Sequence, residues 1–247
     1  MKSRKCAELK RISRENLTGN YRTAMGAFIT ILFISMIIDL PFSSFLYYVY
    51  STKTQIAIYY ICEALISIIV GVLQIGLVKM HLAMAQKKPF SKLDIYYCFK
   101  NNSNRYFSGA ILYFIFEAIA LCPFYIANEY YGFSMKNIGI DLALTGISLL
   151  LLLIIKVLFP FFLYILIERD DLSVTSCLKE ALQMAITNLG RLIYVYLSFI
   201  GMGVLAILSL GIGLLWIEPY YEQTMVNLYL DICEKIPNPE PIFEQRV

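Results

Sequence analysis

The stretch Asp141–Ile167 reads DLALTGISLLLLLIIKVLFPFFLYILI, and the 26 residues from Leu142 onward contain one charge, Lys156. Because an α-helix rises about 1.5 Å per residue, this stretch is long enough to cross the roughly 30 Å hydrocarbon layer of a bilayer. A water-soluble domain offers no environment that would cover such a helix on all sides. The stretch therefore predicts a transmembrane helix and, for the whole chain, an all-α membrane protein.

The composition agrees with this assignment. Hydrophobic residues make up 59% of the 247 residues and charged residues 16%, against about 45–50% and about 25% in soluble domains. A formal net charge of +3 is too small to suggest a nucleic-acid partner. We expect one transmembrane bundle over residues 1–236, followed by a proline-spaced, disordered tail at 237–247.

Further apolar runs predict four more spans, and a sixth segment is more polar. The spans are expected at about 24–48, 56–78, 107–125 and 192–208. The sixth segment, 214–234, contains Glu218, Glu222 and Asp231 and would be a poor lipid-facing helix. We therefore expect a six-segment bundle with five clear spans and a polar sixth segment that lies inside the bundle or partly emerges from it.

Amphipathic helices are expected at the membrane surface. Residues 2–17 place apolar side chains on one side and basic side chains on the other, which suits an interfacial helix or, alternatively, a solvated basic leader that only sets topology. Ser91 with Asp94 forms a capping-box pattern that opens a short helix through Phe99. Ser173 is placed to cap another helix over 172–188.

Three arginines mark an internal repeat. Arg22, Arg105 and Arg191 each follow a candidate amphipathic helix and precede a span, and they are separated by 83 and 86 residues. A near-constant period indicates three copies of one unit, which consists of a surface helix, an interfacial arginine and a helical hairpin. An arginine at this depth can extend its guanidinium to lipid phosphate.

The distribution of lysine and arginine predicts the topology. Residues 1–22 hold seven of them, 79–105 six and 169–191 three, whereas the first and third connections hold one each, Lys53 and Lys136. Sixteen against two predicts a cytoplasmic N-terminus in a multi-pass protein of the cell membrane.

Two of the charges within the spans are predicted to form an ion pair. Glu117 lies 12 residues beyond Arg105, and Lys156 lies 12 residues before Glu168. Both side chains would then reach a similar depth, about 18 Å from the same face. Because a charge at the bilayer centre costs about 2.5–3.5 kcal/mol, a bundle turns such groups inward or pairs them.

Asp39 and Glu63 lie at comparable depth nearer the outer face. Two acids at one depth suit a proton or cation site. The alternative is that they bond backbone groups freed by Pro41 or reach the outer interface.

Motifs of enzymes and metal proteins are missing from the sequence. It contains no HExxH, no P-loop and no GxSxG, His81 is the one histidine, and the six cysteines form no CxxC pair. We expect no catalytic residue, no metal, no cofactor and no enzymatic activity.

Three segments resemble a known family: ELKRISRENLTGNYRTAMGAF, RDDLSVTSCLKEALQMAITNLGRL and LSFIGMGVLAILSLGIGLLWIEPYYEQTMVNLY. They are similar to the bacterial integral-membrane family catalogued as domain of unknown function 975. The resemblance implies a bacterial, cytoplasmic-membrane protein. The family supplies no activity, so no catalytic residue is carried over.

Two functions follow as hypotheses. The first is a non-enzymatic membrane component that assembles with a protein partner or with its own copies, or organises membrane lipids, through its basic surface helices and the small residues of 198–213. The alternative is a small-molecule or ion transporter that uses Glu117, Lys156, Asp39 and Glu63. A transporter needs a polar cavity deep in the bundle, whereas an assembly component can have a dry interior.

Overall fold

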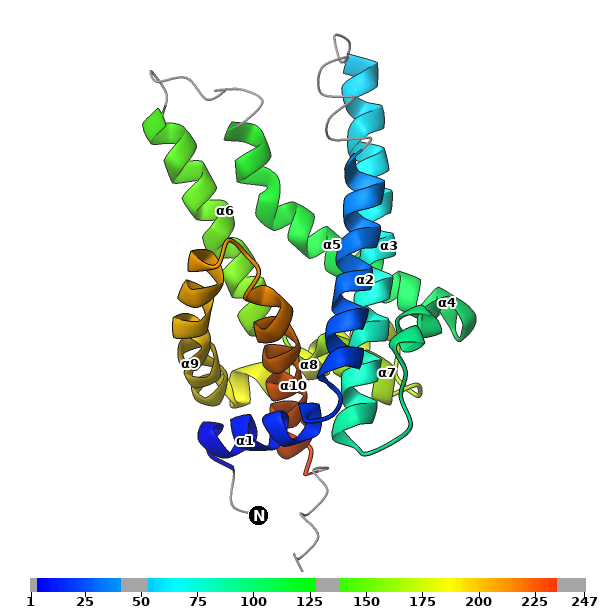
Figure 1. Cartoon of the computed structure of the whole chain (residues 1–247). Helices are drawn as coiled ribbons and strands as arrows, with labels where there is room; N and C mark the ends of the chain where they lie inside the picture. Colours follow the sequence, from blue (N-terminus) through cyan, green and yellow to red (C-terminus); the bar gives the residue numbers. More distant parts are fainter. Residues whose placement is uncertain (1–3, 41–52, 128–137, 235–247) are drawn as a thin grey trace, which may run out of the picture.

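The protein is all-α, as predicted (Figure 1). The structure, a computed structural model, describes residues 4–40, 53–127 and 138–234. In chain order the elements are α1 (Cys6–Leu17), α2 (Tyr21–Leu40), α3 (Lys53–Ala85), the 3-10 helix η2 (Lys92–Tyr96), α4 (Tyr97–Lys100), α5 (Ser103–Ile126), α6 (Ile138–Leu158), α7 (Phe162–Glu168), α8 (Val174–Thr187), α9 (Leu189–Leu208) and α10 (Leu214–Ile232).

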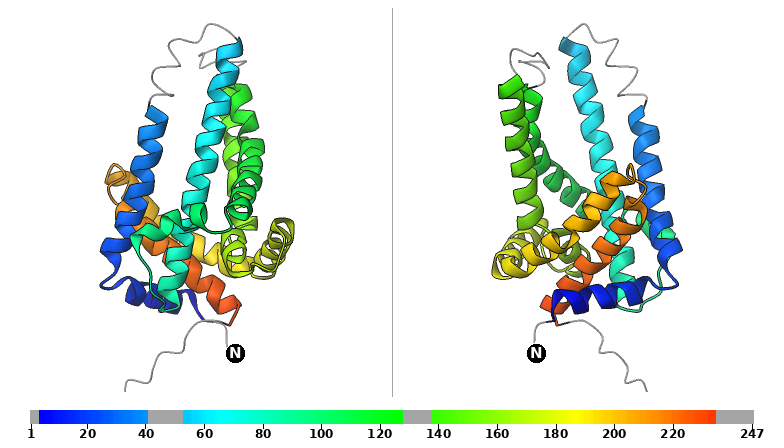
Figure 2. Two further views of the ribbon diagram at one scale, coloured as in Figure 1. Left: turned by 90° about the vertical axis from the view of Figure 1, so that its right-hand side faces the viewer. Right: turned by 60° about the vertical axis from the view of Figure 1, so that its left-hand side comes forward.

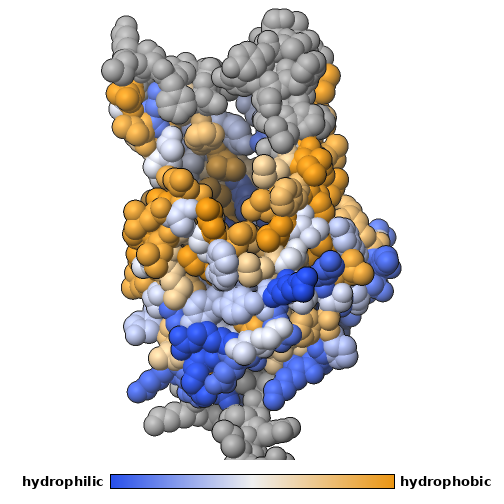
Figure 3. Space-filling view, in the orientation of Figure 1, coloured by the Kyte–Doolittle hydropathy of each residue, from blue (hydrophilic) through white to orange (hydrophobic). Residues whose placement is uncertain are grey.

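Several helices have the length and composition of membrane spans. In the described part of the chain, five stretches are long and apolar enough to cross a membrane: Tyr21–Ile38, Ile58–Ala85, Ser103–Ile126, Ile138–Glu168 and Leu189–Leu208. Their outward surfaces are apolar (Figure 3), with Leu149 at 63% and Ile207 at 77% exposure. Such surfaces are stable in contact with lipid and not in contact with water.

The polar sixth segment forms α10, which is buried within the bundle. Ten of its 19 residues are buried, and it contacts α1, α2, α3 and α9. The polar side chains among them have partners: Gln223 lies 2.8 Å from His81 Nδ1, and Asn227 donates to Ser13 Oγ at 2.8 Å. Because each buried polar group is satisfied, α10 needs no contact with water along this part of its length.

Helix α1 is packed onto the bundle through its apolar face. It lies across one end of α9 and α10 (Figure 2), with Leu9 and Leu17 fully buried. Lys10 Nζ donates to the Ser198 carbonyl at 2.7 Å and lies 4.1 Å from the ring centroid of Phe199. This burial lowers the pKa of Lys10. Protein rather than lipid therefore covers the apolar face of α1.

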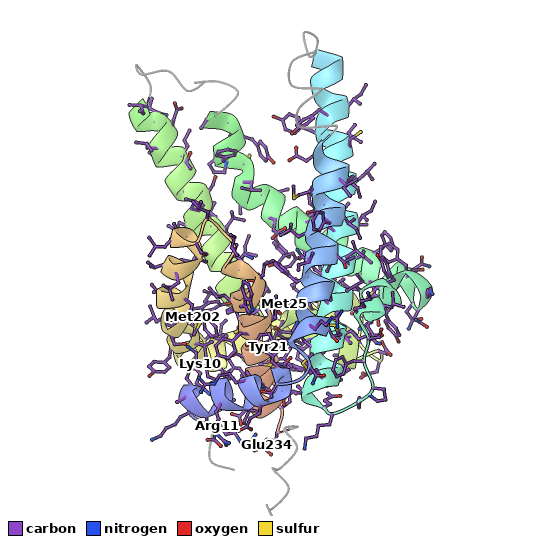
Figure 4. All side chains as sticks on the ribbon, viewed as in Figure 1. Lys10, Arg11, Tyr21, Met25, Met202 and Glu234 are labelled. Carbon is purple, nitrogen blue, oxygen red and sulfur yellow. The ribbon has the colours of Figure 1, made fainter. Side chains whose placement is uncertain are left out.

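One end of the bundle, which we call the charged end, carries α1, α8 and the last turn of α10. Hydrophilic residues gather there in Figure 3, and Arg11 lies on the outer side of α1 in Figure 4. The ion pairs of the described residues, such as Arg11–Glu15 and Arg169–Glu180, lie at or near this end. The start of α1 and the end of α10 therefore share one end of the molecule.

Two predicted helix boundaries are wrong. Helix α3 continues to Ala85 instead of ending near residue 78, because Lys79 stays within the helix and turns its ammonium to Asp94 at 3.5 Å and to the ring of Tyr97 at 3.8 Å. The stretch predicted as one helix over 141–167 is interrupted between α6 and α7 at Pro160, which has no N–H to donate.

Both predicted helix caps are present. Ser91 and Asp94 form a complete capping box, although the helix they open is the 3-10 helix η2, followed by the short α4. Ser173 Oγ accepts the Ser176 N–H at 3.2 Å at the start of α8. The last third of the first predicted span, 41–48, and the tail 237–247 lie outside the described residues.

The described elements fall into three similar groups in chain order, and the repeat inferred from the arginine spacing stays a prediction. Each group has short helices followed by a hairpin of longer ones: α1 with α2 and α3, η2 and α4 with α5 to α7, and α8 with α9 and α10. In the second and third groups, the arginine at the start of the hairpin binds the end of the hairpin: Arg105 donates to Leu166 O at 3.3 Å, and Arg191 donates to Asp231. Arg22 is exposed and makes no such bond among the described residues.

Candidate functional site: a carboxylate-lined cavity

A cavity of about 540 Å³ lies between the long helices. Its wall includes residues of α2, α3, α5, α6, α7, α9 and α10, and Figure 3 shows the hollow above the turn between α9 and α10, with hydrophilic atoms in its depth. Its carboxylic acids and its one amine are four glutamates and one lysine: Glu63, Glu117, Glu218, Glu222 and Lys156. The volume lies within the range of about 300–1,000 Å³ typical of small-molecule sites.

The four glutamates come from three helices. Glu63 lies on α3 and Glu117 on α5, whereas Glu218 and Glu222 are four residues apart on α10 and therefore share one face of that helix. All four are half-buried. If every group is ionised, four carboxylates and one ammonium give the cavity a net negative charge. Burying this charge in a low-dielectric environment is unfavourable, and a bound cation or protonation of a glutamate reduces the cost.

Tyrosines form a second part of the cavity wall. Tyr113, Tyr164, Tyr196 and Tyr221 all line it. Tyr164 donates from its hydroxyl to Glu222 Oε2 at 3.4 Å, and the rings of Tyr196 and Tyr221 lie with centroids 6.2 Å apart. Aromatic faces attract cations, ammonium groups above all, because the ring quadrupole is negative above and below its plane.

The break between α6 and α7 also faces the cavity. Pro160 lines it, and because proline has no N–H, the helix offers no donor to the carbonyl of Lys156, four residues earlier. The hydroxyl of Tyr196 donates to that carbonyl at 2.8 Å. A side chain of α9 thus replaces the missing backbone bond and joins α9 to the broken helix.

The Tyr196 hydroxyl has a testable role. Tyr196→Phe removes the donor and leaves the Lys156 carbonyl unpaired, so we expect the free energy of unfolding in detergent to fall by about 1 kcal/mol. Tyr194→Phe is the matched control, because Tyr194 lies on the same helix and is 63% exposed, and its change should be close to zero. Equal effects of the two substitutions would contradict the assigned bond.

The structure brings some of the predicted site residues together. Glu117, Lys156 and Glu63 line one cavity. The ion pairs of the described residues include none between Glu117 and Lys156, so their pairing stays a prediction. The side chain of Asp39 lies outside the described residues, and the predicted site of Asp39 with Glu63 stays a prediction too.

Sequence reasoning missed Glu218, Glu222 and the four tyrosines as cavity residues. In the sequence, the acids of α10 argue only against a lipid-facing helix. Their spacing of four residues, with Tyr221 between them, was the signal that could have placed them on an inward polar face. Nothing in the sequence identified which helices would oppose that face.

The cavity glutamates are spread around the wall. Within the described ranges, no group of three or more His, Cys, Asp or Glu side chains converges closely enough to hold a metal ion.

The family model described as "Protein of unknown function (DUF975)" matches residues 1–235. No curated protein and no solved structure matches the chain. With nearly its whole length matched, this all-α protein with its carboxylate-lined cavity belongs to the DUF975 family.

Proposed function

We propose that the protein binds small organic cations in the carboxylate-lined cavity and carries them across the membrane. The observation that supports this function is the excess of carboxylates over ammonium groups around a cavity of about 540 Å³ between helices long and apolar enough to span a bilayer. Intramembrane carboxylates are costly, and substrate and ion pathways are where such groups are usually found.

The broken helix supports the same function. In membrane carriers, interrupted helices commonly form the binding site, because their freed backbone groups face a cavity instead of lipid. The interruption at Pro160 lies in the cavity wall. The turn between α6 and α7, to which Tyr196 is hydrogen-bonded, can act as a hinge at which the angle between the two helices changes.

Lys156 has a specific part in this proposal. Its ammonium lies in the same cavity as the glutamates, so it partly neutralises the carboxylates that would attract a cationic substrate. A bound organic cation competes with it. Removing the Lys156 charge should therefore strengthen cation binding, whereas removing a glutamate charge should weaken it.

An assembly role, the other hypothesis from the sequence, finds less support. It uses the basic surface helices and the small residues of 198–213, and of these surfaces the apolar face of α1 is already covered by α10. The deep polar cavity is the feature that favours transport over assembly.

Binding can be measured by isothermal titration of the purified full-length protein with tetraethylammonium and putrescine, with benzoate as an anionic control. We expect a cation to bind and benzoate not to bind. Glu117→Gln and Glu222→Gln should each weaken cation binding at least about tenfold, and Lys156→Gln should strengthen it. Glu15→Gln is the matched control, because Glu15 is an exposed acid of α1.

Transport is tested with the same cations in proteoliposomes. Vesicles are loaded with unlabelled cation, and the uptake of labelled cation from outside is measured. This uptake should be greater than in protein-free vesicles and should be lower for Glu117→Gln than for the wild type. Failure of both cations to bind, or an equal response of Glu15→Gln and Glu117→Gln, would contradict the binding site. Binding without uptake would contradict the carrier function and leave the protein a receptor or assembly component.

A further inference from the structure

A second cavity, of about 530 Å³, lies at the charged end between the start of α1 and the start of α9. Three cationic side chains line it: Arg4, Lys5 and Arg191. Apolar residues, among them Val195 of α9 and Leu228 of α10, form another part of the wall. We call this cavity the arginine groove.

One carboxylate positions the two arginines. Asp231, at the end of α10, accepts from the backbone N–H of Arg4 at 3.3 Å and from Arg191 Nη2, and it lies 3.9 Å from Arg4 Nη1. Arg191 Nη2 also donates to the Arg4 carbonyl at 3.3 Å. Glu8, which is outside the groove lining, lies 3.7 Å from Arg4 Nε. Three cations therefore face two carboxylates, so Asp231 orients the guanidinium groups and the groove keeps a net positive charge.

The groove opens beside a surface that suits lipid. Tyr194 lines it and is 63% exposed, and the neighbouring Ile193 and Leu197 of α9 are 43% and 58% exposed. These residues begin the candidate span Leu189–Leu208, at the depth where headgroups meet hydrocarbon. The positive groove is therefore continuous with an apolar helix face.

Gly190 keeps the groove open. It lines the groove, and a Cβ placed on it would meet no atom within 4 Å. A side chain can therefore start from this position without a clash at its Cβ, and because Gly190 is part of the lining, a larger side chain is expected to take up groove volume.

We infer that the arginine groove binds the headgroup of an anionic phospholipid. Its phosphate is held by Arg4, Lys5 and Arg191, because guanidinium groups match phosphate geometry and Lys5 adds an exposed point charge. The acyl chains lie along the exposed face of α9. A soluble phosphate would use the cations but not the apolar wall, so a lipid fits the groove better. This inference does not depend on transport.

The test uses the full-length protein in a neutral detergent and counts bound lipids by native mass spectrometry. Phosphatidylglycerol is the probe, phosphatidylcholine the zwitterionic control, and inorganic phosphate the competitor. We expect phosphatidylglycerol to bind at least about tenfold more tightly than phosphatidylcholine and to remain bound in millimolar phosphate.

Two variants examine the groove, each with a matched control. Gly190→Leu should weaken phosphatidylglycerol binding about tenfold by filling the groove, whereas Gly203→Leu, on the same helix and equally open, should not. Lys5→Gln should weaken it about fivefold, whereas Lys179→Gln, an exposed lysine of α8, should not. Thermal unfolding of each variant verifies that it is folded.

Three results would overturn the inference. Equal affinity for the two lipids would show that the site binds amphiphiles without selecting an anionic headgroup. Full displacement by inorganic phosphate would show an anion site without lipid specificity. Wild-type binding in folded Gly190→Leu would place the bound lipid somewhere else.

Discussion

Replacing Arg105 with glutamine is expected to lower the free energy of unfolding by about 3 kcal/mol. Arg105 Nε donates to Leu166 O at 3.3 Å and Nη2 to Arg169 O at 2.7 Å, and Nη1 donates to the Leu172 carbonyl. Its side chain is only 15% exposed. One guanidinium thus donates hydrogen bonds to carbonyls at the end of α7 and in the loop into α8. The shorter glutamine side chain cannot reach all three carbonyls. Equilibrium unfolding by SDS in mixed micelles measures the loss.

The repeat supplies the control for this prediction. Arg22 occupies the corresponding position at the start of α2, is exposed, and makes none of the hydrogen bonds or ion pairs found in the described residues. Arg22→Gln should therefore change the free energy of unfolding by less than about 0.5 kcal/mol. If the two arginine substitutions cost the same, the bonds of Arg105 do not stabilise the hairpin end.

The substitution Gly76→Ala is expected to destabilise the protein by a similar amount, about 3 kcal/mol. A Cβ at Gly76 would contact the Ile95 carbonyl oxygen and lie 2.6 Å from the Ile95 carbonyl carbon. These are backbone atoms of η2, which cannot turn aside as a side chain can. Helix α3 and η2 would have to separate, and Ile95, which is 1% exposed, would lose its packing. SDS unfolding is again the measurement.

Gly71 of the same helix serves as the comparison. A Cβ there would meet only the Ala110 Cβ at 3.5 Å, which is ordinary van der Waals contact. Gly71→Ala should change the stability by no more than about 1 kcal/mol, in either direction. A larger cost at Gly71 than at Gly76 would contradict the close approach of η2 to α3.

The sequence predicted the membrane class and the number of long segments because each depends on local properties. Length and hydropathy decide which segments suit lipid. The caps at Ser91 and Ser173 were found for the same reason, since a cap is a contact between residues three or fewer apart.

Helix boundaries were less predictable, because they depend on partners distant in sequence. Lys79 remains within α3 since Tyr97 and Asp94 receive its ammonium. The break at Pro160 is satisfied by Tyr196, 36 residues farther along the chain. A hydropathy profile reports neither partner.

By itself, then, the sequence determined that this chain is a bundle of apolar helices and that some of these helices contain ionisable side chains that lipid would not accommodate. It could do so because the free energy of placing a side chain in lipid is a property of each segment. Only the tertiary structure decided where these ionisable side chains lie. It turns Glu218 and Glu222 of α10 toward the cavity that Glu63 and Glu117 share with Lys156, and it docks α1 beneath them. Helix crossing and rotation decide which faces meet, and these follow from packing between distant segments.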